Sequence, residues 1–268
     1  MKKLEHLSEI YNFYDTYIID LWGVMHNGIK LNERATEAVD NLTKANKKVV
    51  FLSNAPRPNK NVINFLRKLN MSEIYLNNIL TSGEAALKSI QNKIFGEYFF
   101  HLGPLRDNSL YEGLEKNKVS IEKSNFILCT GLFDNHEKDL QYYKKLLKNY
   151  TSKKLICTNP DLIVHRGDKE EYCAGAVAKI FEELGGEVVY FGKPYKAIYD
   201  IFLKEKEKAF IIGDNLNTDI KGANNLNLDS LFITDGVHKS EFSKEEDLPK
   251  LLNKYNIKSK YFQKELTW

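Results

Sequence analysis

A chain of 268 residues can form one large domain or two smaller ones, and its 43% hydrophobic content can support a buried core. The net charge of +3 is small and the lysines are dispersed, which argues against a nucleic-acid partner. No segment approaches the roughly 20 apolar residues of a membrane span, and the start lacks the apolar core of a signal peptide. Three cysteines without a CxxC pair fit a reducing compartment, so we expect a cytoplasmic protein with no membrane partner.

The first part of the chain alternates apolar runs with helical patterns. We expect an amphipathic helix over residues 4–14, a strand over 17–19, a helix from 32 to about 45, a strand over 49–52 and a helix over 60–69. The first strand ends on Asp20, and the second ends in Ser53 and Asn54. A strand–helix–strand–helix order predicts a parallel sheet and an α/β fold.

The middle of the chain has a complete set of its own elements. Strands are expected near residues 99–102, 126–129, 155–157 and 187–190, and helices near 84–93, 137–148 and 172–184. This set suffices for a separate small domain. We therefore expect a core formed by residues 1–78 and 190–268, with a second domain inserted over residues 79–189.

The last part returns to the first pattern. A Gly-Lys-Pro turn at 192–194 precedes a helix over about 195–203 and a strand over 209–212, which ends in Gly213 and Asp214. A further strand is expected over residues 230–233. Leucines at helical spacing near residues 248–252 predict a final helix.

Polar residues follow several of the predicted core strands or the turn beside them. They are Asp20, Ser53, Asn54, Lys193, Asp214 and Asp219. Because the carboxyl ends of parallel strands meet at one edge, we expect these groups in a single cleft. Clustered carboxylates repel one another unless a cation joins them, and Mg²⁺ is the natural partner of oxygen ligands. Together with a lysine, this set predicts phosphoryl transfer through an aspartyl-phosphate.

The order of these motifs resembles the haloacid dehalogenase (HAD) superfamily. It runs Asp-x-x-Gly-Val, hydrophobic-Ser-Asn, Gly-Lys-Pro and finally Gly-Asp-x-x-x-Thr-Asp-Ile-x-Gly-Ala. The chain is most similar to subclass IIA, the NagD-like phosphatases. This resemblance implies a Rossmann-like core with a C2-type α/β cap, Mg²⁺ as cofactor and a small phosphorylated metabolite as substrate. Capped members of this branch often pair, so a homodimer is an expectation of the same kind.

The resemblance also implies roles for individual residues. Asp20 would be the nucleophile and a metal ligand, together with the backbone carbonyl of Trp22 and the carboxylate of Asp214. Asp219 would support the metal indirectly, and Lys193 would neutralise Asp20 and the phosphoryl group. The expected substrate contacts are Ser53 and Asn54 on the phosphoryl oxygens and, from the cap, Asn159 and Asp161 near the leaving group.

The first motif departs from the family pattern. The phosphatases have Asp-x-Asp, whereas this chain has Asp20-Leu21-Trp22, and an indole cannot exchange a proton as a carboxylate does. Three outcomes stay open: hydrolysis limited to esters whose leaving group needs little protonation, a replacement acid such as His26, or binding of a phosphorylated ligand without turnover. The last outcome would make the chain a catalytically impaired binding or regulatory module. For Trp22 itself we favour packing over the cleft.

Four further residues stand near predicted strand ends or the cap. Arg57 and Arg166 could meet anionic parts of a substrate, and Asp235 and His238 could line the cleft. For each of them, a loop or surface role is the favoured interpretation.

Overall fold

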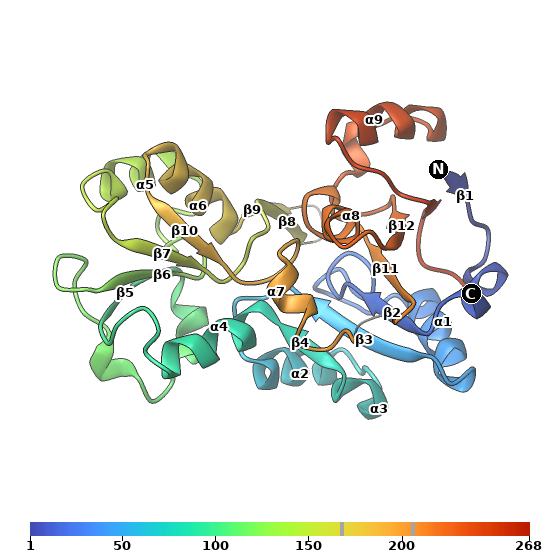
Figure 1. Ribbon diagram of the computed structural model, residues 1–268, viewed down its shortest axis with the longest axis horizontal. Helices are drawn as coiled ribbons and strands as arrows, with labels where there is room; N and C mark the ends of the chain where they lie inside the picture. The colour runs from blue at the N-terminus through green and yellow to red at the C-terminus, as the bar shows by residue number, and fades with distance from the viewer. Residues whose placement is uncertain (167–168, 205–206) are drawn as a thin grey trace.

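The computed structural model describes residues 1–166, 169–204 and 207–268, apart from the side chain of Arg166. The expectation for that arginine therefore lies outside the described residues. The molecule has two lobes, each built on a parallel sheet (Figure 1). The predicted α/β class is confirmed.

The larger lobe contains a sheet that, in the described ranges, has seven strands, all of them parallel. In spatial order they are β1 (Lys2–Lys3), β13 (Tyr261–Gln263), β12 (Asp229–Ile233), β11 (Ala209–Gly213), β2 (Thr16–Ile19), β3 (Lys48–Ser53) and β4 (Ile79–Thr81). The strand β2 lies between β11 and β3, with Ile18 opposite Ile211 and Val50. This central place follows from its four buried residues, since a strand covered on both faces is apolar throughout.

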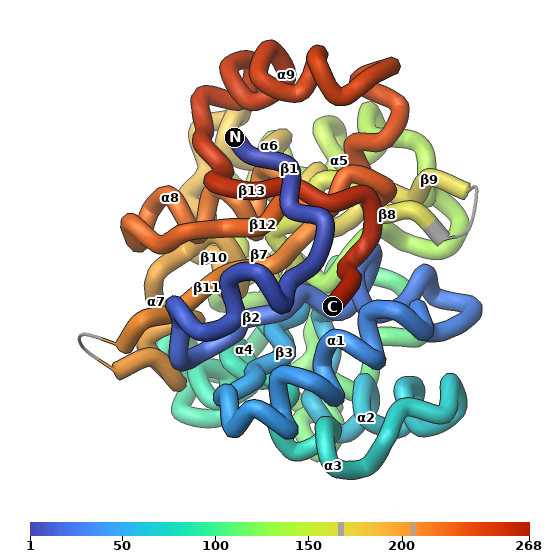
Figure 2. The backbone as a smooth tube through the Cα atoms, turned by 90° about the vertical axis from the view of Figure 1, so that its right-hand side faces the viewer, coloured from blue at the N-terminus to red at the C-terminus, as the bar shows by residue number. Residues whose placement is uncertain are grey.

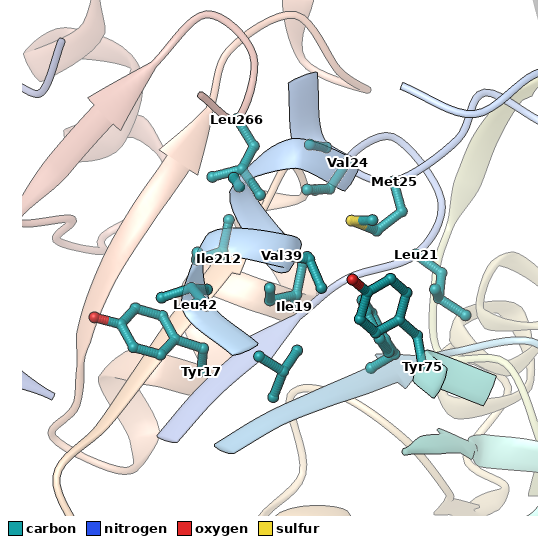
Figure 3. Packing of buried hydrophobic residues seen from close by; sticks show 14 of the residues in the cluster. Tyr17, Ile19, Leu21, Val24, Met25, Val39, Leu42, Tyr75, Ile212 and Leu266 are labelled. Atoms are coloured by element: carbon teal, nitrogen blue, oxygen red, sulfur yellow. The ribbon is translucent and has the colours of Figure 1, made fainter. Parts of the chain in front are cut away.

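Helices cover both faces of this sheet. They are α1 (Glu33–Lys44), α2 (Asn59–Lys68), α3 (Glu73–Leu76), α7 (Lys196–Tyr199), α8 (Lys221–Asn225) and α9 (Leu248–Lys254). Asn32 caps α1 by accepting hydrogen bonds from the backbone of Arg34 and Ala35. Figure 3 shows Val39 and Leu42 of this helix beside Ile19 of β2. The opposite face packs mainly against α7 and α8.

The smaller lobe is the inserted cap. Its sheet has the order β10 (Glu187–Tyr190), β7 (Lys154–Cys157), β6 (Phe126–Cys129) and β5 (Phe99–Leu102), again all parallel. The helices α4 (Ser82–Gln91), α5 (Leu140–Leu147) and α6 (Ala174–Glu183) accompany it. The expected cap limits of 79 and 189 need correction: β4 pairs with β3 in the core sheet, and β10 continues to Tyr190. A three-residue strand is too short to show periodicity in the sequence.

Other expectations differ from the structure near the chain ends and in the cap. Residues 4–14 form two 3₁₀ turns, Leu7–Glu9 and Tyr11–Phe13, rather than one helix, although Leu4, Leu7 and Ile10 are buried as the pattern predicts. An antiparallel hairpin, β8 (Ile163–Arg166) and β9 (Lys169–Tyr172), was not expected. The Gly-Asp pair at 167–168 of the sequence is of the kind that joins two hairpin strands, so the sequence did carry a signal for this hairpin.

The two ends of the chain lie on the same lobe. Figure 2 shows β1 running beside β13, and Lys2 pairs with Tyr261. Across the described ranges, we find no helix with both the length and the apolar character that crossing a bilayer would require.

Candidate active site

A cleft of about 1170 Å³ lies between the carboxyl edge of the core sheet and the cap. Asp20 follows β2, and Asp214 follows β11. Ser53 is the last residue of β3, and Asn54 follows it. The backbone N–H of Asp20 donates to Ile212 at 2.9 Å, so the sheet ladder holds this carboxylate in place. Every predicted site residue lines the cleft: Asp20, Trp22, Ser53, Asn54, Asn159, Asp161, Lys193, Asp214 and Asp219.

Lys193 is a buried cation of the cleft and is only 2% exposed. Its ammonium group donates to Asp20 and lies 2.7 Å from Oδ1 of Asp219. Burial acts to lower the pKa of Lys193, but the neighbouring carboxylates of Asp20 and Asp219 outweigh it and raise the pKa above its ordinary value. The lysine therefore remains protonated at neutral pH and compensates two buried carboxylates.

The carboxylates of Asp20, Asp214 and Asp219 form one cluster. Each offers an oxygen, and these oxygens all lie within 4.8 Å of one another. Burial, opposed by Lys193, raises the pKa of Asp20 well above its ordinary value. Burial and the charge of Asp219 raise the pKa of Asp214 to about 7. One lysine thus does not satisfy three buried carboxylates, and a hard divalent cation fits this donor set.

Two of the carboxylates have backbone partners that fix their orientation. Val237 donates its N–H to Asp214 at 2.8 Å, and Asn215 donates its N–H to Asp219 at 3.1 Å. Gly23 has a φ of +92°, and a Cβ there would lie 2.2 Å from Asp214. The turn after Asp20 therefore approaches Asp214 more closely than a side chain would allow.

Two asparagines of the core join the cap at the edge of the cleft. Asn54 accepts from the Lys193 backbone at 2.8 Å and donates back to its carbonyl at 3.1 Å. Asp161 accepts from Asn54 at 3.3 Å and from Asn215 at 3.2 Å. Burial raises the pKa of Asp161 to about 6. Asn54 and Asp161 thus hold the lysine turn and the cap together. Asn215 was not among the predicted site residues, although it stands inside the last motif, between Asp214 and Asp219.

Ser53 and Asn159 have simpler surroundings. Ser53 accepts at Oγ from the backbone of Ala55 at 3.2 Å, and Asn159 accepts at Oδ1 from the backbone of Asp161 at 3.1 Å. Both side chains are buried and line the cleft, Ser53 from the core and Asn159 from the cap. The hydroxyl of Ser53 can still donate toward a bound anion.

Comparison with known proteins identifies the family. A model of haloacid dehalogenase-like hydrolases matches residues 17–115, and a second HAD-hydrolase-like model matches residues 190–260. A crystal structure of a haloacid dehalogenase-like hydrolase from Brucella suis superposes with a TM-score of 0.85 at 29% identity, covering 98% of this chain and 100% of that one. The chain belongs to the HAD superfamily.

Relatives with a named activity place the chain in the NagD-like branch, subclass IIA, of that superfamily. A 4-nitrophenylphosphatase of Schizosaccharomyces pombe is 26% identical, over 92% of this chain and 94% of its own length. An acid sugar phosphatase of Staphylococcus haemolyticus is 24% identical, over 87% and 90%. The structure of p-nitrophenyl phosphatase from Archaeoglobus fulgidus shares the fold, with a TM-score of 0.72 at 21% identity over 94% and 96%. The Rossmann-like core with an inserted cap is confirmed.

Trp22 occupies a distinctive place in this HAD site. Its indole N–H donates to the backbone carbonyl of His165 in the cap hairpin at 2.6 Å. The ring of His26 lies edge-on to the indole, with centroids 5.1 Å apart, and it also lies edge-on to Phe65, with centroids 5.4 Å apart. The side chain at this position therefore packs between core and cap.

His26 does not suit the role of a general acid. It is 4% exposed, and its Nδ1 accepts the backbone N–H of Gly28 at 3.0 Å. Burial lowers the pKa of His26 to about 4. The imidazole is therefore neutral near pH 7 and has no acidic proton to give to a leaving group.

The remaining candidates have structural partners. Arg57 forms an ion pair with Asp107 of the cap at 2.7 Å, and Asp235 pairs with Lys239 at 2.5 Å at the rim of the cleft. His238 lies outside the cleft, where its Nε2 accepts the N–H of Leu216 at 3.0 Å. His238 thus has the loop role favoured for it, whereas Arg57 and Asp235 line the cleft, contrary to the favoured interpretation.

Proposed function

We propose that this HAD hydrolase cleaves small phosphate monoesters through an aspartyl-phosphate on Asp20. The observation that carries the proposal is the buried cluster of Asp20, Lys193, Asp214 and Asp219 at the floor of a capped cleft. An Asp20 oxygen attacks phosphorus, and the bond from phosphorus to the ester oxygen breaks with its electron pair. Water then cleaves the acyl phosphate to release inorganic phosphate and restore the carboxylate.

The same cluster is the proposed site for Mg²⁺. Asp20, Asp214 and the backbone carbonyl of Trp22 would hold the ion, and Asp219 would act through Lys193. When bound, the ion would neutralise charge on the phosphoryl oxygens and on the nucleophile. The chemistry of the donor set supports this assignment, because carboxylate and carbonyl oxygens are the ligands that Mg²⁺ prefers.

The chain's own residues orient the phosphoryl group. Lys193, held protonated by its carboxylate neighbours, would offset the charge that develops on the equatorial oxygens. Ser53 would donate its hydroxyl to one of these oxygens. Asn54 would contribute chiefly by fixing the Lys193 turn, since both of its polar atoms bind that backbone. Asn159 and Asp161 would line the leaving-group side.

The missing acid restricts the substrates. Neither Trp22 nor the neutral His26 can protonate a departing alkoxide, so phosphate esters of weakly basic leaving groups should react best. The second step should also be slow, because Trp22 cannot accept a proton from the water that attacks the aspartyl-phosphate. A small phosphorylated metabolite with a good leaving group is therefore the proposed natural substrate class.

A leaving-group series tests this proposal. Phosphate release with Mg²⁺ from aryl phosphates of increasing phenol pKa should fall steeply in the wild type. Trp22→Asp should flatten that dependence and gain up to about 10²–10⁴-fold on the poorest leaving groups. Equal dependence in both proteins would contradict the role assigned to position 22, and no release from any ester would contradict phosphatase activity.

A second candidate is a phospho-ligand-binding protein without turnover, favoured by the indole at the acid position. It predicts that phosphate esters raise the melting temperature saturably in the presence of Mg²⁺ while no phosphate is released. The same samples distinguish the two functions, because turnover consumes the stabilising ester and binding alone does not.

Pairing of two copies of this chain through the cap is a further proposal, and the molar mass in solution tests it.

A further inference from the structure

The loop after Asp20 holds the Trp22 side chain in one orientation. A Cβ at Gly28, whose φ is +84°, would lie 2.6 Å from the indole ring, so the ring packs directly on that glycine. His26 closes the loop, because its carbonyl accepts the N–H of Gly23 at 2.8 Å and its ring abuts the indole. The indole thus packs against Gly28 and His26 of its own loop.

The indole N–H group of Trp22 contacts the cap. It donates to the carbonyl of His165 at 2.6 Å, and donor and acceptor are 143 residues apart in the chain. His165 belongs to β8, so the residue two positions after the nucleophile contacts the β8–β9 hairpin directly.

This hairpin forms one wall of the cleft. Val164 lies opposite Glu171 in the antiparallel pair, and both residues line the cleft. Within the described part of the chain, β8 and β9 form a two-stranded sheet joined to no third strand. Isolated two-stranded hairpins are marginally stable, so the position of this wall depends on what anchors it.

We propose that Trp22 is a positioning residue that anchors the β8–β9 hairpin over the nucleophile and thereby sets which leaving groups fit. Position 22 then acts on substrate selection rather than on proton transfer. The ligands affected are phosphate esters whose leaving group is large enough to touch Val164 and Glu171. The statement about the hairpin stands on the contacts alone, whereas the statement about leaving groups rests on the proposed phosphatase function.

An isosteric replacement tests the anchor without turnover. Incorporating 3-benzothienylalanine at position 22 replaces the indole N–H by sulfur and keeps the bicyclic ring. Hydrogen–deuterium exchange of the hairpin amides should become roughly five- to tenfold faster, as expected when one hydrogen bond is lost from a local opening equilibrium. Unchanged exchange would overturn the proposal. The matched control is the same replacement at Trp268, whose ring packs on Tyr11 with centroids 5.1 Å apart.

A second variant moves the ring without changing Trp22. Gly28→Ala places a methyl group against the indole, whereas Gly113→Ala introduces the same strain at a φ of +84° where a Cβ meets nothing within 4 Å. Gly28→Ala should speed hairpin exchange and Gly113→Ala should not. Equal effects of the two substitutions would show that backbone strain, and not the indole contact, controls the hairpin.

Kinetics then separate positioning from general loosening. In the benzothienyl variant, KM for a bulky aryl phosphate should rise at least about threefold more than KM for acetyl phosphate, whose leaving group is too small to reach the hairpin. Equal changes for both substrates would overturn the selection role. If neither protein turns over any substrate, the phosphatase proposal fails, while the exchange result still decides whether Trp22 anchors the hairpin.

Discussion

The core and the cap each contain a parallel sheet, but different types of residue follow the strands of the two sheets. Both are parallel, and residues just after their strands line the same cleft. After core strands β2 and β11 stand Asp20 and Asp214, whereas cap strands β5 and β6 are followed by Gly103-Pro104 and Thr130-Gly131. These two core strands therefore place carboxylates at the cleft, whereas these two cap strands place uncharged residues there. Strand-end geometry brings residues together, but the residue types decide whether the edge is reactive.

The largest expected effect comes from removing the proposed nucleophile on the core side. Asp20→Asn should lower kcat for phosphate release by at least about 10³-fold, because the covalent step is lost. The matched control is Asp134→Asn in the cap, where the carboxylate is 50% exposed and outside the cleft. A comparable loss in the control would remove the functional contrast between the two lobes.

Removing the core cation should have the next largest effect. Lys193→Met leaves Asp20 and Asp219 buried without their shared counter-charge, so kcat should fall by about 10²–10³-fold. The folded state should also lose about 3–5 kcal/mol, because one partner of a buried ion pair has gone. Urea unfolding with and without Mg²⁺ measures this loss. Unfolding at the wild-type urea concentration would show that the cluster is not compensated by the lysine.

Magnesium affinity should depend on pH through the core carboxylates. Burial raises the pKa of Asp214 to about 7, so without metal the folded chain holds more protons than the unfolded chain between about pH 4 and 7. The contribution of this group to the stability of the metal-free protein therefore decreases as pH rises through that window. Mg²⁺ competes with the proton for the carboxylate. Below pH 7, the Kd for Mg²⁺ should therefore fall by up to about tenfold for each unit by which the pH rises.

Calorimetric Mg²⁺ titrations at pH 5.5, 6.5 and 7.5 measure this dependence. A Kd independent of pH would show that the binding carboxylates are already ionised in the metal-free protein. The Asp214→Asn variant supplies the control, since it removes the titrating group and should bind weakly at every pH.

The smallest effect is expected on the cap side. Asn159→Ala removes a neutral side chain from a cap strand end, so KM should rise about two- to tenfold while kcat changes less than about threefold. Steady-state kinetics on one aryl phosphate suffice. A fall in kcat comparable with that of Lys193→Met would mean that the cap also takes part in the chemistry.

The sequence alone determined the reactive edge of the core. An apolar run that stops at Asp20 or Asp214 defines a buried strand and the residue after it, and parallel topology then brings such residues together. Local pattern was therefore enough to predict the cluster with Lys193, which is confirmed as a buried contact. It also sufficed for the α/β class, for α1 and for the existence of an inserted cap.

Only the tertiary structure decided what surrounds that cluster. The hydrogen bond from Trp22 to His165, the joining of Asn54 and Asn215 by Asp161, and the burial that makes His26 neutral all depend on segments distant in the chain. Hydrophobic periodicity records which face of an element is buried but not which partner covers it. The sequence therefore showed that a tryptophan stands two residues after Asp20, whereas only the packing of the two lobes showed that its indole contacts the β8–β9 hairpin.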